Sequence, residues 1–295
     1  MKKEKIVIAD PNAEWKNSVG WQNLNTEERI TLLEKEGKFD IDSSDDPPTF
    51  ELKPEEIDYL RKKWINKLKT KLANKVASNY IEKLIKQGNL VIKEINGLEH
   101  FEGLNSGALI TCNHFNPFDN FAIQKVFEKV QKPKQKMWKI IREGNYTNPP
   151  CLPFFFKNCD TLPLSENKHT MMKFLQALKT VLTRGDYVLI YPEESLWWNY
   201  KKPKPLKNGA FNLAVRNNSP VIPIFITIKD VAHKDDSFAM VQEYYVHILE
   251  PIYPDKNLSK QENIKQMKQR NYNAWVEVYE KFYGEKLTYL CDKNN

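Results

Sequence analysis

The chain has 295 residues, of which 41% are hydrophobic, 28% charged and 12% aromatic, and its formal net charge is +7. This length and aromatic content allow a substantial core, which excludes an intrinsically disordered protein. No apolar stretch approaches the roughly 20 residues that a membrane-spanning helix needs, and the basic excess permits anionic partners without selecting one.

The N-terminal residues 1–50 are interpreted as a polar extension that ends in a linker. Their early apolar run, Ile6 to Ala9, is too short for a secretory signal. The acidic, proline-bearing stretch 42–48 indicates the linker itself, so a domain boundary is placed before residues 51–295. The chain has four cysteines and no C-x-x-C pair, so we expect free thiols in a reducing cytoplasm and no zinc knuckle.

A long amphipathic helix is predicted within residues 51–88. Pro54 suits its first position, and apolar residues recur at spacings of three and four from Ile57 until Gly88. Between Arg61 and Lys75 there are seven basic residues and no acidic one. The segment is therefore either a cationic helix lying on an anionic bilayer or a surface helix whose apolar stripe packs on the domain.

Residues 90–250 alternate strand patterns with helix patterns. Strands are predicted over 91–95, 108–112, 136–141, 187–191, 221–228 and 241–249, and helices over 121–130, 170–182 and 209–216. The C-terminal segment 251–295 carries one more helix, over 262–283. This alternation predicts an α/β fold with a mostly parallel central sheet flanked by helices.

A histidine and an aspartate directly follow the strand predicted over 108–112. Ligands of open α/β sheets bind at the carboxyl ends of strands, and Pro117 favours a turn that brings Asp119 back toward His114. A carboxylate that orients an imidazole allows the ring to take a proton from a hydroxyl. In the alternative interpretation, His114 bonds a backbone carbonyl and Asp119 caps the helix that starts near Phe121.

Four segments resemble, in the same order, the motifs of the phospholipid/glycerol acyltransferase family, the group of lysophosphatidic acid acyltransferases. They are Ala108 to Asp119 with its His-x4-Asp spacing, Lys139-Ile140-Ile141-Arg142, Tyr191-Pro192-Glu193-Glu194-Ser195, and Val221-Ile222-Pro223-Ile224. A link resembling the family's, from Lys207 to Ala214, lies between the last two, and the similarity spans about residues 91–229. Four ordered motifs are far more specific than the His-x4-Asp spacing alone.

The resemblance implies an enzyme of phospholipid biosynthesis that resembles 1-acylglycerol-3-phosphate O-acyltransferases and forms no covalent enzyme intermediate. His114 would be the general base and Asp119 its orienting partner. The acceptor would be bound by the side chains of Arg142, Glu193, Ser195 and Lys207.

The same resemblance implies the partners. They are an acyl thioester, either acyl-CoA or acyl carrier protein, and a glycerol-phosphate-type or lysophospholipid acceptor, with no metal and no other cofactor. The expected location is cytoplasmic, peripheral on the inner face of an anionic membrane.

The third motif departs from the family pattern Phe-Pro-Glu-Gly-Thr-Arg. Glu194-Ser195-Leu196 stand in place of Gly-Thr-Arg, so the arginine that would help bind a phosphate is missing. Two accounts follow. A lysine at position 201, 202, 204 or 207 supplies the cation, or the acceptor carries no phosphate and is, for example, a glycolipid.

Two aromatic segments each allow two interpretations, and three competing functions are open to the chain. Trp197, Trp198 and Tyr200 suit either a membrane interface or packing over the site, and 151–156 suits a core strand better than an acyl-chain tunnel. A metal-dependent hydrolase is disfavoured because no H-x-H or H-x3-H spacing occurs, and a nucleic-acid partner because aromatics do not interleave with the basic run. A non-catalytic lipid-binding protein stays open.

Overall fold

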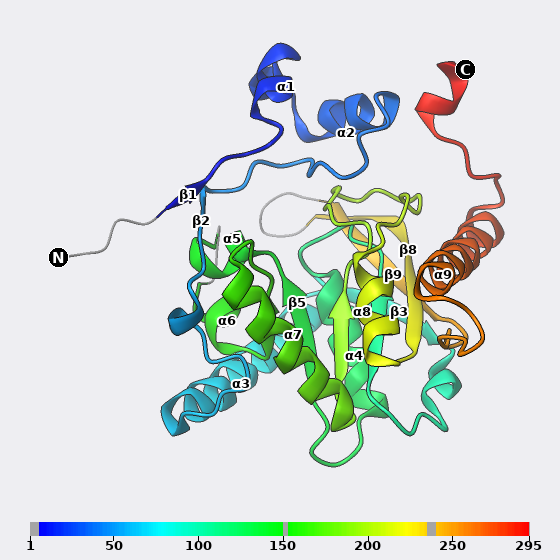
Figure 1. Cartoon of the computed structure of the whole chain (residues 1–295). Coiled ribbons are helices and arrows are strands. Elements are labelled where there is room, and N and C mark those ends of the chain that lie inside the picture. Colours follow the sequence, from blue (N-terminus) through cyan, green and yellow to red (C-terminus); the bar gives the residue numbers. More distant parts are fainter. Residues whose placement is uncertain (1–5, 150–152, 235–239, 295) are drawn as a thin grey trace.

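A computed structural model describes residues 6–149, 153–234 and 240–294, and its centre is a seven-stranded sheet (Figure 1). The strand order is β3-β9-β8-β4-β7-β5-β6, and every neighbouring pair is parallel except β8 with β9. The strands are β3 (Val91–Asn96), β4 (Ala108–Cys112), β5 (Met137–Ile141), β6 (Thr161–Pro163), β7 (Tyr187–Ile190), β8 (Val221–Lys234) and β9 (Met240–Ile248). The predicted α/β fold with a mostly parallel sheet is confirmed.

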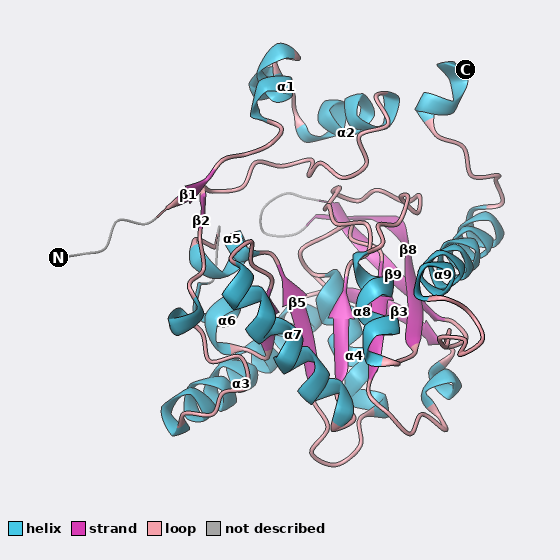
Figure 2. Cartoon of the chain, in the orientation of Figure 1, coloured by secondary structure: helices cyan, strands magenta, loops and turns pink. Residues whose placement is uncertain are grey.

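Helices cover both faces of the sheet (Figure 2). Helix α4 (Asp119–Val130) and the second half of α3 (Trp64–Lys86) pack on one face, and α7 (Lys168–Thr183), α8 (Gly209–Asn217) and α9 (Lys260–Tyr283) pack on the other. Strand β4 shows how the layers form, because Leu109 joins the cluster of α7 while Ile110 and Cys112 join the cluster of α4. Alternate side chains of a strand point to opposite faces, so a fully apolar strand contributes to both cores.

Three elements between β5 and α7 were not predicted from the sequence: α5 (Glu143–Thr147), α6 (Pro153–Asn158) and β6. The expectation of a core strand over 151–156 is wrong for its described part, which forms α6, with Phe154 40% exposed. Pro153 begins this helix, at a position that proline favours because its missing N–H has no intrahelical partner there. Cys151 and Leu152 lie outside the described residues.

The long helix begins ten residues later than predicted, at Trp64 rather than Pro54. Pro54 starts a short 3-10 turn, η2 (Pro54–Glu56), and the chain is not helical from there to Lys63. The reason is local: the Asp58 carboxylate accepts hydrogen bonds from the backbone N–H groups of Lys62 and Lys63, at 2.9 and 3.0 Å. Arg61 adopts φ 53° and is buried, so it does not belong to the cationic surface that the sequence suggested.

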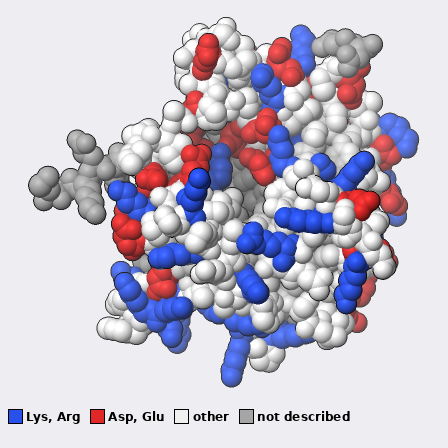
Figure 3. All heavy atoms as spheres, viewed as in Figure 1, with Lys and Arg blue, Asp and Glu red and all other residues white. Residues whose placement is uncertain are grey.

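The first half of α3 exposes an apolar stripe instead of packing it. Trp64, Leu68, Leu72 and Val76, spaced by four residues, are 74%, 56%, 55% and 41% exposed. Thr70 and Ala73 form the buried side of this half. Lysines surround the stripe, and Figure 3 shows Lys and Arg gathered over this part of the molecule. The interpretation in which the whole stripe packs on the domain is therefore wrong here. Among the described helices, none is long and apolar enough to cross a membrane.

The N-terminal residues form small elements that lie over the carboxyl ends of the central strands (Figure 1). These are β1 (Val7–Ile8), α1 (Ala13–Ser18), η1 (Trp21–Asn23), α2 (Thr26–Lys35) and β2 (Thr49–Phe50). The segment Phe39–Asp46, called the acidic strap below, runs between α2 and β2. Phe39 and Ile41 anchor the strap in a cluster with Trp197 and Tyr289, the latter just before the C-terminal turn η4 (Leu290–Asn294).

Candidate active site

His114 and Asp119 meet at the carboxyl end of β4. The imidazole Nδ1 lies 2.7 Å from Asp119 Oδ2, and the ring is 24% exposed while the carboxylate is fully buried. Among the described residues nothing hydrogen-bonds the other ring nitrogen, Nε2. Asn113 fixes the turn by exchanging two hydrogen bonds with the backbone of Ile226 on β8, at 2.8 and 3.0 Å. The predicted juxtaposition of histidine and aspartate is thus present in the structure.

The Asp119 carboxylate is saturated with donors. Besides the imidazole, Oδ2 accepts from the backbone N–H groups of Phe115 and Asn116 at 3.2 and 3.3 Å. Helix α4 begins at Asp119 itself, so the alternative in which this side chain caps a later helix is wrong. A buried carboxylate held by several donors is an anion with a fixed orientation, which in turn fixes the imidazole.

Tyr191 contacts both His114 and Asp119, and the sequence analysis did not single it out as a site residue. Its hydroxyl donates to Asp119 Oδ1 at 2.6 Å, and its ring stacks on the imidazole of His114 with centroids 3.9 Å apart. Burial, with the Asp119 charge beside it, raises the pKa of Tyr191 well above its usual value, so the hydroxyl stays a donor. The family motif has phenylalanine at this position. The departure from phenylalanine at this position was the signal in the sequence.

Glu193 and Ser195 lie close to His114 but turn their oxygens to the protein. Glu193 is 2% exposed; it accepts from the backbone N–H of His114 at 3.0 Å and of Lys204 at 2.9 Å. It also pairs with the buried ammonium of Lys204 at 3.4 Å, and this ammonium donates to Ser195 Oγ at 2.8 Å. Ser195 donates onward to the carbonyl of Phe39 at 2.6 Å. In this conformation both side chains hold the loop after β7, and their acceptor-binding role stays a prediction.

Glu194, which replaces a glycine of the family motif, keeps the backbone conformation that glycine would favour. Its φ is 60°, in the left-handed region that non-glycine residues seldom adopt. Burial raises the pKa of this carboxyl, and nearby Asp40 adds to the rise while Lys207 opposes it. The substitution therefore adds a carboxyl group whose charge is disfavoured, at a backbone position that glycine would favour.

Arg142 and Lys207, the cations predicted to bind the acceptor, both contact carboxylates of the N-terminal segment. The Arg142 guanidinium pairs with Asp42 and Asp46 at once, and Lys207 Nζ lies 2.8 Å from Asp40. Arg142 and His114 both follow the carboxyl ends of strands, and β5, β7 and β4 are consecutive in the sheet, so the two residues lie on the same side of the molecule. The role of Arg142 toward an acceptor also stays a prediction.

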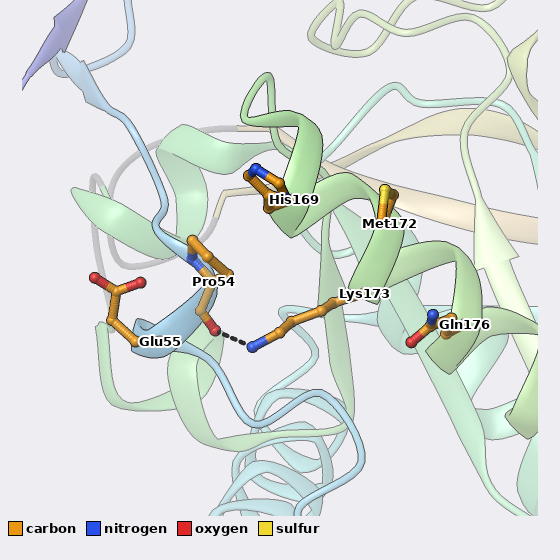
Figure 4. Close-up of a pocket in the computed structure, with 6 residues that line it drawn as sticks. All are labelled: Pro54, Glu55, His169, Met172, Lys173 and Gln176. Atoms are coloured by element: carbon orange, nitrogen blue, oxygen red, sulfur yellow. Dashed lines mark hydrogen bonds between the residues drawn. The ribbon is translucent and has the colours of Figure 1, made fainter.

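The remaining features near the site are packing and surface. Trp197 is fully buried against Phe39, whereas Trp198 is 40% exposed. A surface pocket of about 460 Å³ lies between η2 and α7 and includes none of the motif residues; Figure 4 shows its lining, with Lys173 donating to the Pro54 carbonyl at 2.8 Å. Within the described part of the chain, no group of three or more His, Cys, Asp or Glu side chains is arranged to hold a metal ion.

The fold and the site define a class: an α/β domain that presents a carboxylate-oriented histidine at the carboxyl edge of its sheet. Residues 92–227 match the family model described as Acyltransferase, in agreement with the resemblance of the four motifs. No curated protein sequence matches the chain. A similar solved structure is PlsC, the 1-acyl-sn-glycerophosphate (LPA) acyltransferase from Thermotoga maritima, with a TM-score of 0.46 and 15% identity, covering 71% of this chain and 81% of that one.

Proposed function

We propose that the protein transfers a fatty acyl group from a thioester to a hydroxyl of a lipid acceptor, with His114 as the general base. The observation that carries the proposal is the 2.7 Å contact between His114 Nδ1 and the buried Asp119, which leaves Nε2 free in a partly exposed ring. The carboxylate holds the Nδ1–H tautomer, so Nε2 is the nitrogen that accepts a proton.

The reaction follows from this geometry without a covalent enzyme intermediate. Nε2 takes the proton of the acceptor hydroxyl as its oxygen attacks the carbonyl carbon of the thioester. The tetrahedral intermediate then collapses, the carbon–sulfur bond breaks, and the imidazolium returns its proton to the leaving thiolate. Asp119 stabilises the imidazolium in between. The donor is acyl-CoA or acyl carrier protein, and no further cofactor enters the scheme.

The proposal is tested by following the release of free thiol from acyl-CoA in the presence of lipid acceptors. We expect thiol release only when an acceptor with a free hydroxyl is supplied, together with an acylated product. A protein that binds lipid vesicles but releases no thiol with any acceptor would instead be a non-catalytic lipid-binding protein.

Tyr191→Phe restores the residue of the family motif and removes one hydrogen bond to Asp119. A hydrogen bond to a charged group contributes about 1.5–3 kcal/mol, of which only a part acts on the transition state, so we expect kcat to fall roughly tenfold. KM for the acceptor should not change, because the hydroxyl is bonded within the protein. Steady-state kinetics of the wild type and the variant checks this. An unchanged kcat would show that Tyr191 does not position Asp119.

We further propose that the first half of α3 binds an anionic membrane surface. The support is the exposed stripe from Trp64 to Val76, flanked by lysines, because an apolar stripe with cationic borders is typical of helices that lie in the bilayer interface. Phe154 on α6, which packs beside α3, adds another exposed apolar side chain.

Replacing Lys67, Lys71 and Lys75 together by glutamine should weaken binding to anionic vesicles about 100-fold. Each lysine near such a surface contributes about 1 kcal/mol, and binding to neutral vesicles should not change. Vesicle sedimentation measures both. A matched control replaces three exposed lysines of α9 and its N-terminal cap region, Lys256, Lys260 and Lys265, by glutamine. Equal losses in the two triple variants would show that net charge, not α3, determines the binding.

A further inference from the structure

The acidic strap occupies the place where a phosphate of the acceptor was expected. Both terminal guanidinium nitrogens of Arg142 pair with strap carboxylates, Nη1 with Asp42 and Nη2 with Asp46. Asp42 also accepts a hydrogen bond from the backbone N–H of Leu196, at 2.5 Å. Leu196 stands where the family motif has its second phosphate-binding arginine. A single aspartate thus bridges the second and third motifs, as an anionic headgroup would.

The four lysines that the sequence offered as substitutes for the missing arginine are likewise paired with carboxylates. The pairs are Lys201–Asp230 at 3.1 Å, Lys202–Glu34 at 2.6 Å, Lys204–Glu193 at 3.4 Å and Lys207–Asp40 at 2.8 Å. Lys139 of the second motif donates to Asn120 on α4 at 3.0 Å, and burial lowers its pKa. Each cation considered for a phosphate therefore already has a partner in the described structure.

The strap is held to the domain by hydrogen bonds and by apolar packing. Trp197 Nε1 donates to the carbonyl of Ile41 at 2.7 Å, and the Ser43 N–H donates to the carbonyl of Leu196 at 3.1 Å. The Phe39 ring stacks on buried Trp197 with centroids 5.5 Å apart. Displacing the strap would expose these apolar side chains and leave Trp197 without its acceptor, which is costly.

We infer that the acceptor presents an uncharged, hydroxyl-bearing headgroup, and that Asp42 and Asp46 of the strap hold Arg142 in place of an acceptor phosphate. The inference rests on the proposed acyl transfer and selects between the two acceptor classes that the sequence left open. A phosphate dianion at this edge would face two carboxylates for one guanidinium, and like charges in a partly desolvated site repel strongly. A neutral glycerol or sugar hydroxyl meets no such repulsion. Figure 3 shows acidic side chains gathered around the hollow beneath the N-terminal helices.

The test compares two acceptors that differ only in the phosphate, 1-monoacylglycerol and 1-acylglycerol 3-phosphate with the same acyl chain. Both are presented in neutral detergent micelles with acyl-CoA. Wild type should show a kcat/KM at least about tenfold higher for the neutral acceptor. The double variant Asp42→Asn with Asp46→Asn should raise kcat/KM for the phosphate acceptor about tenfold, because it removes the two charges that occupy Arg142. It should change kcat/KM for the neutral acceptor less than about twofold, because each asparagine keeps a carbonyl oxygen.

A matched control removes two carboxylates from the same N-terminal segment without touching Arg142. Asp10→Asn with Asp45→Asn serves, since both aspartates pair with Lys16, and it should leave the acceptor preference unchanged. If the strap variant does not fold by circular dichroism, Asp46→Asn alone, at a residue whose side chain is 39% exposed, should give the same direction of change.

A wild-type preference for the phosphate acceptor would overturn the inference and leave acyl transfer intact. Failure of the proposed function looks different, because no acceptor would then release thiol. Calorimetric titration with glycerol 3-phosphate needs no turnover: wild type should show no binding at millimolar concentration, and the strap variant should bind. Binding to wild type that Arg142→Gln abolishes would overturn the inference whatever the activity.

Discussion

His114→Ala should lose acyl transfer by a factor on the order of 10²–10⁴, with its folding unchanged. The general base is removed, whereas the ring contributes little to the core because it is 24% exposed. Asp119 keeps the backbone N–H donors of Phe115 and Asn116 and the Tyr191 hydroxyl, so its buried charge stays compensated. The loss should appear in kcat for every acceptor that the wild type accepts. Thiol release under saturating donor measures it.

The matched control for this variant is His169→Ala, which removes an imidazole from the surface of α7, away from the motifs. It should keep full activity. Asp119→Asn is a second comparison, because the amide keeps the volume but no longer stabilises the imidazolium; we expect a loss of similar order. Full acyl transfer by His114→Ala, with an intact circular dichroism spectrum, would refute the assigned mechanism.

The fold and the His–Asp pair were predictable because their signals are local. Strand β4 is five consecutive apolar or small residues, and the turn that returns Asp119 to His114 lies within six residues of it. The adjacency of β4 and β7 then brings Glu193 to the same edge, although it lies 79 residues from His114. Motif order supplied that step, since no local pattern encodes which strands become neighbours.

The acidic strap was not predictable because its partners are distant in the chain. Ser43 and Leu196 are bonded across 153 residues, and Asp42 and Arg142 across 100. The composition of 42–48 resembles an ordinary linker, and nothing local reveals that its carboxylates are counter-ions. One local signal was available upstream: Asn25 and Glu28 form a capping box that starts α2, and this pattern is readable from sequence.

Lys204 shows the same limit of prediction from local sequence. The sequence presented it as one of four lysines that could supply a cation for an acceptor phosphate, but the structure buries it to 1% exposure against Glu193, which is 2% exposed. Its ammonium also donates to the carbonyl of Ser195 at 2.8 Å, and burial lowers its pKa. The pair thus joins the loop after β7 to the backbone of His114, so it helps to hold His114 in place.

Lys204→Met should therefore destabilise the fold by about 3–5 kcal/mol, because it leaves the Glu193 carboxylate buried without its cation. The free energy of unfolding in urea measures this. Glu193→Gln combined with Lys204→Met should recover a good part of the loss, since no charge is then left uncompensated. Lys201→Met, at an exposed pair with Asp230, should change stability by less than about 0.5 kcal/mol. If Lys204→Met were as stable as the wild type, Glu193 would have to reach solvent, and a role for it in binding acceptor hydroxyls would become the better explanation of its place beside His114.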